Sequence, residues 1–312
     1  MLSTQKITVA IPVYNGQKYI LEALHSIFDQ TQKVDSIIVC DNHSTDDTVN
    51  IVNQIIDEHE EFNIKLYIND SNLGVIRNFN KCIELCTTDF LIILGVDDRL
   101  KPDTVKRHIN VFKKMPELGM VGGIYDTINQ DGETTNIPRK NETIIFEKGD
   151  ILSFMKRTGF YMQHSTIMFN MKCTRNVGYY DFKGIAPDER FNVEHLVKYP
   201  IAQIREGITE SRIHDNQVTN LERLRFEDKL LHFQANLDMA KYESTPLRRK
   251  ELKNLLKVWI AAQCISIGRK VWKNYGEYGI ALKYWNYGIK QNPNILIKQH
   301  FWRTIALSVL HR

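Results

Sequence analysis

The sequence of 312 residues contains no long hydrophobic run, and no uninterrupted apolar stretch approaches the roughly 18 residues that span a membrane. The first residues, Met1 to Lys6, lack the apolar core of a secretory signal. The five cysteines include no CxxC pair, the usual mark of a metal or dithiol site. We therefore expect a cytoplasmic protein, and we assign no chemical role to any cysteine.

Two glycine-rich signatures are also absent. The sequence has neither the GxxxxGK[ST] loop nor the GxGxxG fingerprint, in which backbone amides of a glycine-rich turn hold phosphate groups. If this protein binds a phosphorylated ligand, the charge of that ligand must be neutralised in another way. A metal ion is the expected alternative.

Charge is distributed unevenly along the chain. From Lys241 to Arg312 there are 14 Lys and Arg residues and three acidic residues; the whole chain carries +4, which leaves the preceding 240 residues at −7. All the tryptophans lie in this same basic segment: Trp259, Trp272, Trp285 and Trp302. Two interpretations stay open. The segment contacts an anionic membrane surface, or its tryptophans pack helices together and its basic residues form a solvated face.

The first part of the chain alternates between strand-like and helix-like patterns. Apolar runs predict strands at Ile7 to Val13, Ile37 to Cys40, Ile64 to Ile68 and Phe90 to Leu94. Helical periods predict helices at Tyr19 to Phe28, Asp46 to His59 and Val75 to Leu85, and Pro102 opens a fourth. This order predicts an α/β fold with a mostly parallel sheet and helices on both faces. Ligands of such sheets bind beyond the carboxyl ends of the strands.

Candidate site residues lie at the ends of three of the predicted strands. PVYNG at the end of the first supplies Pro12, Tyr14 and Asn15, Asp41 follows the second, and Asp97 and Asp98 follow the fourth. Adjacent carboxylates disfavour each other's ionised form, so we expect a positively charged partner at the last of these positions. The run Ser44 to Asp47 is best explained as the cap of the following helix. Asp41 precedes that cap and is not needed for it.

Four segments carry a resemblance to a known family. They are, in order, IPVYNGQKYILEALHSIFDQT, IIVCDNHSTDDT, NLGVIRNFNKCI and GVDDRLKPD. Together they resemble the inverting GT-A glycosyltransferases of family 2, over roughly Ile7 to Asn216. The resemblance implies the Rossmann-like GT-A fold. In that family the first half binds a nucleoside diphosphate sugar, and an acidic pair, the DXD motif, holds Mn²⁺ or Mg²⁺ against the diphosphate.

The resemblance assigns roles to individual residues of the first half. It implies that Asp41 hydrogen-bonds the base, that Asp97 binds the sugar or ribose, and that Asp98 ligates the metal. Many members carry a further aspartate where Gly95 stands here, which leaves open whether more than one carboxylate touches the ion. The nucleotide-sugar site also includes Pro12, Tyr14, Asn15 and Arg77. Arg77 pairs with phosphate or forms a surface salt bridge.

The second half is expected to hold the acceptor and the catalytic base. Inversion by direct displacement needs one carboxylate that removes the proton of the attacking hydroxyl. In the family this base lies in an acidic pair after a glycine-aromatic-aspartate turn, which implies Asp188 or Glu189 after VGYYD; alternatively, these acids favour a helix dipole. His214 resembles the histidine of an Arg-x-His segment that reaches the metal or diphosphate, although a lone loop histidine is often merely exposed. His164, in the strand candidate MQHSTIMF, is expected to line the acceptor cleft.

The chain is predicted to have two domains. Residues 1–220 form the GT-A domain, with the nucleotide-sugar half at about 1–100 and the acceptor half at about 101–220. Residues 221–312 form a helical, basic extension. Pro246 to Lys250 is the best linker candidate within that extension.

The predicted function is inverting, metal-dependent transfer of a sugar from a nucleoside diphosphate sugar, with UDP as the expected nucleotide. The expected acceptor is a glycan or a polyprenyl-linked sugar in bacterial surface polysaccharide synthesis, at the inner face of the cell membrane, with no nucleic-acid partner. A sugar-nucleotide pyrophosphorylase is an alternative, but PVYNG lacks its glycine- and arginine-rich loop. An inactive nucleotide-sugar or glycan binding module is another, yet Asp98, Asp188 and Glu189 are present. The spacings do not fit a response-regulator receiver.

Overall fold

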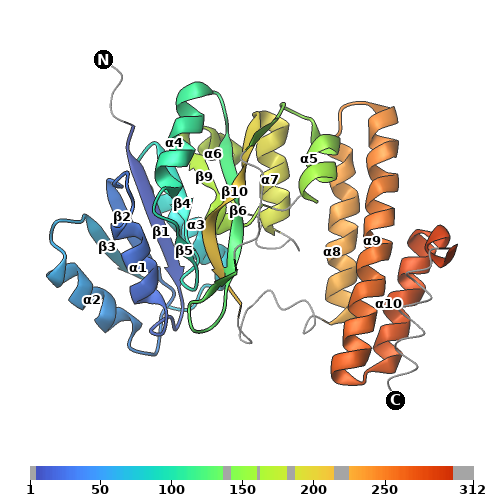
Figure 1. Ribbon diagram of the computed structural model, residues 1–312, viewed down its shortest axis with the longest axis horizontal. Helices are drawn as coiled ribbons and strands as arrows, with labels where there is room; N and C mark the ends of the chain where they lie inside the picture. The colour runs from blue at the N-terminus through green and yellow to red at the C-terminus, as the bar shows by residue number, and fades with distance from the viewer. Residues whose placement is uncertain (1–4, 136–141, 160–161, 181–186, 214–224, 298–312) are drawn as a thin grey trace. The chain divides into compact units, whose positions relative to one another are not determined.

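The computed structural model describes residues 5–135, 142–159, 162–180, 187–213 and 225–297 (Figure 1). The chain divides into two compact units, which are described separately. The first comprises Met1–Lys183 and Pro187–His214, and the second comprises Gly184–Ala186 and Asp215–Arg312. The predicted domain boundary at residue 220 lies outside the described residues.

The first unit is built around one mixed sheet. Its strands are β1 (Ile7–Val13), β2 (Ser36–Asp41), β3 (Ile64–Ile68), β4 (Phe90–Ile93), β5 (Arg99–Leu100), β6 (Met120–Ile128), β7 (Thr134–Thr135), β8 (Thr143–Phe146), β9 (Met168–Asn170) and β10 (Ile201–Arg212). Its helices are α1 (Ile20–Phe28), α2 (Thr48–Glu58), α3 (Val75–Leu85), α4 (Thr104–Lys114), α5 (Ile151–Thr158), α6 (Met171–Val177) and α7 (Pro187–Lys198). A 3₁₀ turn, η1 (His164–Thr166), precedes β9.

The strand order is β3-β2-β1-β4-β9-β6-β10-β5, with β7 beside β6 and β8 beside β10. The first four strands in this order pair in parallel, as the alternation of strands and helices predicted. Strand β9 then pairs antiparallel with both β4 and β6. The sheet is therefore parallel where the nucleotide-sugar half was predicted and mixed beyond it.

Both faces of the parallel part are covered by helices (Figure 1). Successive side chains of a strand point to opposite faces. Alternate residues of β1, from Ile7 to Val13, join a core with apolar residues of α1, α2 and α4. Helix α3 packs against β1 and β2 on the other face, where the Asn78 amide donates to the Cys40 carbonyl at 2.9 Å. Each fully buried Val or Ile of this core contributes about 1.5–3 kcal/mol to folding.

The predicted strand around His164 is only partly a strand. Residues His164–Thr166 form the 3₁₀ turn η1, and extended backbone begins at Met168. The physical cause lies in a distant residue, because Gln163 and Ser165 both donate side-chain hydrogen bonds to Asp98. These polar contacts hold the segment as a turn against the end of β4.

The second unit is helical. Its elements are α8 (Phe226–Met239), η2 (Ala240–Tyr242), α9 (Pro246–Tyr275), α10 (Tyr278–Gln291) and η3 (Pro293–Ile297). The predicted linker at Pro246 to Lys250 is wrong, since these residues are the first turn of α9, a helix of 30 residues. Thr245 caps this helix by accepting a hydrogen bond from the Arg248 amide, and proline suits the first helical position because its missing N–H is not needed there.

The described tryptophans pack inside this helical unit. Trp285 is buried and donates from Nε1 to the Ile265 carbonyl at 3.3 Å. Its ring meets Trp272 edge-on at 5.7 Å, and Trp259 lies edge-on to Phe233 at 6.2 Å. This arrangement supports the packing interpretation for these three residues. Trp302 lies outside the described residues.

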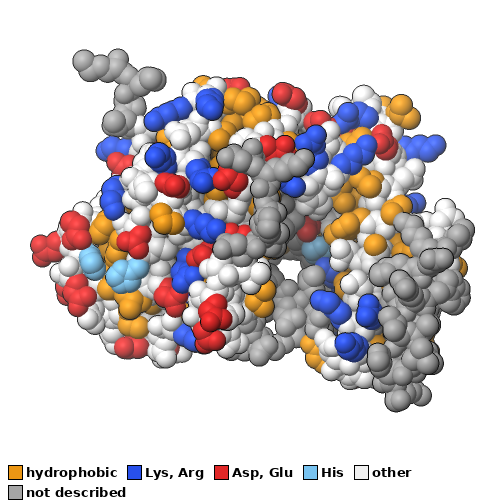
Figure 2. Space-filling model, in the orientation of Figure 1, with side chains coloured by type: hydrophobic (Ala, Val, Ile, Leu, Met, Phe, Trp, Pro, Cys, Tyr) orange, Lys and Arg blue, Asp and Glu red, His pale blue; other side chains and the backbone are white. Residues whose placement is uncertain are grey.

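Basic side chains of the helical unit lie at its surface. Figure 2 shows Lys and Arg among hydrophobic and uncharged side chains on the face in view. Across the described ranges, no helix combines the length and the apolar character that a membrane crossing requires. Contact of the basic segment with an anionic membrane surface stays a prediction.

Gly268 of α9 lies where this helix packs closely against α10. A Cβ atom at Gly268 would lie 2.5 Å from Nε1 of Trp285 and 3.0 Å from the backbone oxygen of Ala281. Overpacking in Gly268→Ala should cost about 1–3 kcal/mol, while alanine gains roughly 1 kcal/mol in a helix. The free energy of unfolding should therefore fall by up to about 2 kcal/mol. Gly279→Ala is the control, because no atom lies within 4 Å of its Cβ position. Urea unfolding should show the control to be neutral or stabilised; equal stability of both variants would contradict this packing.

Candidate active site at the carboxyl edge of the sheet

The loop after β1 is tied to the loop after β2 through Asn15. The Asn15 side-chain oxygen accepts from the Thr45 backbone amide at 2.8 Å, and the Asn15 backbone amide donates to the Ser44 hydroxyl at 2.8 Å. Asn15 has a φ of 53°, a left-handed conformation that asparagine adopts more readily than most residues. Of the other predicted residues, Pro12 is buried within β1 and Tyr14 is 48% exposed. Pro12 and Asn15 thus support the structure of β1 and of the loop after it, whereas the Tyr14 ring is accessible to a ligand.

Asp41 ends β2 and is fully buried. Its Oδ2 atom accepts a hydrogen bond from the Ser44 amide at 2.9 Å. Its Oδ1 atom has no hydrogen-bond partner within the part of the chain that the structure describes. A buried acceptor left unsatisfied costs about 1–3 kcal/mol, so this oxygen is suited to a ligand that brings an N–H or O–H donor.

The acidic turn after β4 is held by hydrogen bonds to Asp98. Its Oδ2 atom accepts from the Ser165 hydroxyl at 2.6 Å and from the Gln163 amide at 3.0 Å. Its Oδ1 atom accepts from the backbone amide of Arg212 at 3.2 Å. Burial first, and then the negative charge of Asp97, raise the pKa of Asp98 to about 7. The charge of Asp97 therefore opposes the ionisation of Asp98 in the folded protein.

Arg212 is a component of this site whose role the sequence analysis missed. Its guanidinium group is buried, donates to the Asp97 carbonyl at 3.2 Å and to the Asn129 carbonyl at 3.0 Å, and pairs with Glu22 at 2.6 Å. A buried cation is stable only when it is paired in this way. The Arg-x-His segment contained the signal, but only its histidine was considered. Arg212 fixes both the backbone and the carboxylate side of the acidic turn.

Three potential ligand atoms converge where Gly95 has no side chain. A Cβ atom at Gly95 would lie 3.1 Å from Oδ1 of Asp97, 3.2 Å from Oδ2 of Asp98 and 3.4 Å from Nε2 of His164. Burial lowers the pKa of His164 to about 4, so its imidazole is neutral near pH 7. His164, predicted to line the acceptor cleft, thus lies beside the acidic pair. His214 lies outside the described residues.

The space between Asp97, Asp98 and His164 fits a divalent cation that takes some of its ligands from the protein and the others from a phosphorylated substrate. Within the described ranges, no three His, Cys, Asp or Glu side chains form a group that could hold a metal alone. Mg²⁺ in nucleotide enzymes needs only one or two carboxylates, because phosphate oxygens and waters complete its shell. Asp97 and Asp98 meet that requirement, and the neutral imidazole of His164 is in its ligating form.

The predicted acidic pair of the second half lies in the first turn of α7. Asp188 is partly exposed, whereas Glu189 is buried. Burial, and next the charge of Asp188, raise the pKa of Tyr180 above its ordinary range, which places Asp188 near this tyrosine. Acids in this position also favour the helix dipole, so both interpretations of the pair are compatible with the structure.

Ring contacts connect the acidic turn with this second half. His164 meets Phe79 edge-on at 4.9 Å, and Phe79 meets Tyr180 edge-on at 5.9 Å. Tyr180 then lies against Phe191 of α7 at 4.1 Å. A row of ring contacts therefore leads from His164, beside the Asp97-Asp98 turn, to Phe191 of α7, the helix whose first turn carries Asp188.

Arg77 lies on the exposed side of α3, where it lines a pocket with Tyr179 and Tyr180. Its predicted role at the nucleotide sugar stays a prediction.

Comparison with known proteins identifies the family. The profile of Glycosyl transferase family 2 matches residues 8–174, more than half of the chain. The chain belongs to this family. The matched segment includes Asp41, the acidic pair and His164, so the family 2 resemblance predicted from four motifs is confirmed.

Individual relatives of this family 2 chain are distant. It is 27% identical over 180 residues to the dolichyl N-acetyl-alpha-D-glucosaminyl phosphate 3-beta-D-2,3-diacetamido-2,3-dideoxy-beta-D-glucuronosyltransferase of Methanococcus voltae, covering 55% of this chain and 54% of the relative. It is 30% identical over 126 residues to the chondroitin synthase of Escherichia coli, covering 40% of this chain and 18% of the relative. The chain thus spans about half, or less, of the length of these relatives.

Among solved structures, the family 2 chain is similar to residues 1–349 of S. aureus TarS, crystallised in complex with UDP-GlcNAc. The TM-score is 0.69 at 16% sequence identity, and the match covers 92% of this chain and 81% of TarS 1–349. This likeness confirms the predicted GT-A fold with additional C-terminal helices.

Proposed function

We propose that this family 2 member transfers a sugar, with inversion, from a nucleoside diphosphate sugar to a glycan or lipid-linked acceptor. The observation that carries the proposal is the buried carboxylate of Asp41, whose Oδ1 atom has no hydrogen-bond partner among the described residues. It ends β2, while the acidic turn follows β4, and both flank β1 in one parallel sheet. Ligands of parallel sheets bind at this edge.

The nucleotide is UDP in this proposal. The N3–H group of uracil is a donor that would satisfy Oδ1 of Asp41, and the half-exposed Tyr14 follows the neighbouring strand β1. The UDP-GlcNAc complex of TarS, a protein of the same fold, supports a UDP-linked donor. Asp97 then lies on the side of the ribose and sugar.

Asp97 and Asp98, with His164 beside them, would hold Mn²⁺ or Mg²⁺. When bound, the ion supplies positive charge that stabilises the departing diphosphate. Ser165, Gln163 and Arg212 keep the Asp98 carboxylate in one orientation through the hydrogen bonds described above. A preorganised carboxylate costs no reorganisation energy during the reaction.

Asp188 is our proposed base. It removes the proton from the acceptor hydroxyl while the hydroxyl oxygen attacks the anomeric carbon on the face opposite the diphosphate. Asp188 is partly exposed beside Tyr180, whereas Glu189 is buried, so an acceptor reaches the aspartate more easily. The bond to the diphosphate breaks as the new glycosidic bond forms.

The acceptor class and the membrane contact belong to the same proposal. Relatives include a teichoic acid poly(glycerol phosphate) polymerase of Staphylococcus epidermidis and the chondroitin synthase named above. These names support a polysaccharide or lipid-linked acceptor. A surface-bound acceptor would explain the basic helical unit, whose charge would hold the enzyme at an anionic membrane.

Asp41→Asn tests the nucleotide site. The amide oxygen can keep the Ser44 bond, which turns the amide N–H₂ toward the ligand, where it opposes the uracil N3–H donor. UDP affinity should fall about 10- to 100-fold, because the lost bond involves a charged group. CDP affinity should rise relative to UDP affinity, since N3 of cytosine accepts a hydrogen bond. Calorimetric titration with both nucleotides and Mn²⁺ measures this preference.

Asp35→Asn is the matched control. Its carboxylate also accepts one backbone N–H bond, from Ile7 at 2.8 Å, but it precedes β2 at the opposite edge of the sheet. We expect no change in either nucleotide affinity. Unaltered UDP affinity in Asp41→Asn would exclude Asp41 from the base site.

A further inference from the structure

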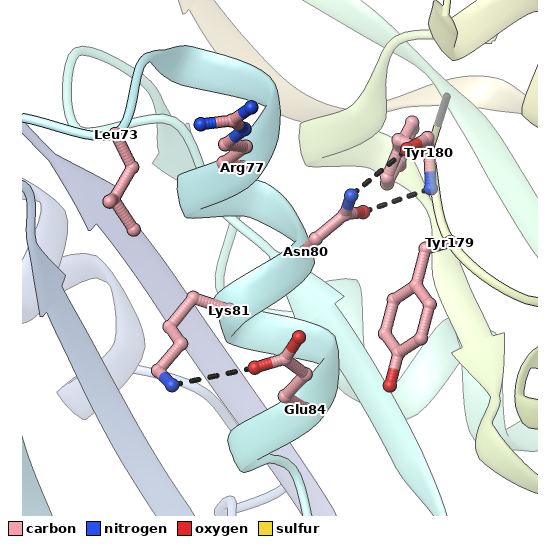
Figure 3. A pocket seen from close by; sticks show the side chains of 7 residues that line it. All are labelled: Leu73, Arg77, Asn80, Lys81, Glu84, Tyr179 and Tyr180. Carbon is pink, nitrogen blue, oxygen red and sulfur yellow. Dashed lines mark hydrogen bonds and ion pairs between the residues drawn. The ribbon is translucent and has the colours of Figure 1, made fainter. Parts of the chain in front are cut away.

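A pocket lies beside α3. Its volume is about 440 Å³, within the range of small-molecule sites. The lining residues come from α3, from the segment before it and from the turn after α6: Leu73, Arg77, Asn80, Lys81, Glu84, Tyr179 and Tyr180 (Figure 3). None of these residues is needed for the nucleotide site described above, apart from the untested role of Arg77.

The tyrosine wall of the pocket is held rigidly. The Asn80 amide group donates to the Tyr180 carbonyl at 2.9 Å, and its oxygen accepts from the Tyr180 backbone amide at 2.9 Å. Tyr180 is buried, with its ring against Phe191. The adjacent Tyr179 is 53% exposed, and Figure 3 shows its ring across from the end of α3 that carries Glu84. A fixed backbone thus presents an accessible aromatic ring to the pocket.

Hydrogen-bonding side chains line the opposite wall. Lys81 and Glu84 form an ion pair of 3.4 Å at the surface, and Arg77 lies one turn before Lys81 on α3. An aromatic ring opposite charged side chains suits a pyranose. The C–H face of the sugar stacks on the ring, while its hydroxyls form hydrogen bonds with carboxylate and ammonium groups. The Tyr180 ring packs at 4.1 Å against Phe191 of α7, the helix whose first turn carries Asp188.

We propose that this pocket binds a saccharide unit of the acceptor chain, with Tyr179 as its stacking platform. The inference deepens the proposed function and rests on it, since it specifies the acceptor as an oligosaccharide. A sugar held beside Tyr180 lies on the side of the proposed base, Asp188, and leaves the Asp41 edge to the nucleotide. Tyr179 is then a determinant of acceptor affinity.

The test uses the full chain with saturating UDP and Mn²⁺ on a glycan array of neutral, N-acetylated and uronate-containing oligosaccharides. The affinity of the strongest glycan is then measured by calorimetry. Tyr179→Ala should weaken this affinity about tenfold, which corresponds to one good stacking contact. Tyr179→Phe keeps the ring face and should bind within about threefold of wild type. Tyr275→Ala, which truncates a tyrosine of similar exposure (50%) in α9, should bind as wild type.

Three results would overturn the inference. The first is that the array shows no glycan bound to wild type. The second is that Tyr179→Ala binds the glycan as tightly as wild type. The third is that Tyr179→Ala loses as much affinity for UDP as for the glycan, which would make the pocket a nucleotide site. Failure of the proposed function gives a different result, because wild type would then bind neither UDP nor a UDP sugar. Normal UDP binding with a glycan affinity that ignores Tyr179 refutes only the acceptor pocket.

Discussion

Asp98→Asn should reduce sugar transfer about 10³-fold and abolish the Mn²⁺ dependence of UDP binding. The substitution removes the negative charge that faces the cation, and a diphosphate leaving group then departs without charge stabilisation. The amide has nearly the same size as the carboxylate, so the effect on packing is small. Initial rates with a UDP sugar and Mn²⁺ titrations monitored by UDP binding measure the two effects separately.

Asp103→Asn is the matched control for this prediction. Asp103 lies in the same LGVDDRLKPD segment, but its carboxylate accepts a hydrogen bond from the Thr31 hydroxyl at 2.8 Å, away from the acidic turn. Its rate should equal that of wild type. Because Asp98 accepts three hydrogen bonds, thermal unfolding of each variant shows whether the fold is kept. A folded Asp98→Asn with normal turnover, or wild-type activity in excess EDTA, would contradict the assignment of a metal to this turn.

Asp188→Asn should lower kcat about 10²- to 10⁴-fold, the contribution of a positioned general base. The affinity for UDP should stay close to wild type, since the base acts on the acceptor in the transition state. Rapid-quench measurement of a single turnover separates this chemical step from donor binding.

Glu189→Gln and Glu194→Gln complete this experiment. Glu194 lies on the same helix and pairs with Arg190 at 2.8 Å near the surface, so its amide should be neutral. Glu189→Gln should retain most of kcat if burial keeps this residue from the acceptor. Loss of turnover in Glu189→Gln alone would move the role of base to Glu189. Near-normal kcat in both Asp188→Asn and Glu189→Gln would place the base outside this pair of residues.

Much of the first unit could be predicted from local sequence patterns. Strand β1 is a continuous apolar run because it is buried on both faces, and the periodic apolar residues of α1 identify the side that joins the core. Once these elements alternate, parallel pairing follows, and the carboxyl ends of β1, β2 and β4 must share one edge. Asp41 and the acidic pair could therefore be placed together without any tertiary information.

Other features depended on contacts between distant residues. The segment MQHSTIMF is a strand candidate by sequence, yet hydrogen bonds from Gln163 and Ser165 to Asp98, more than 60 residues away, accompany a turn at His164–Thr166. Pro246 suggested a linker, although it begins a helix of 30 residues. A proline interrupts a helix in its interior but is favourable at its first position, and only the surrounding packing determines which case applies.

The sequence by itself determined the order of the first four strands and helices and the edge at which the nucleotide is proposed to bind, because both follow from periodicity or from residues adjacent in the chain. Its four motifs also carried the resemblance to family 2. Only the tertiary structure decided that Arg212 supports the acidic turn and that Asn80 holds Tyr180, 100 residues away. These pairings depend on strand order and on the packing of α3 against the sheet. Neither residue is marked by a local sequence pattern, because the role of a buried arginine or of an amide that binds the backbone is visible only once folding brings its partners beside it.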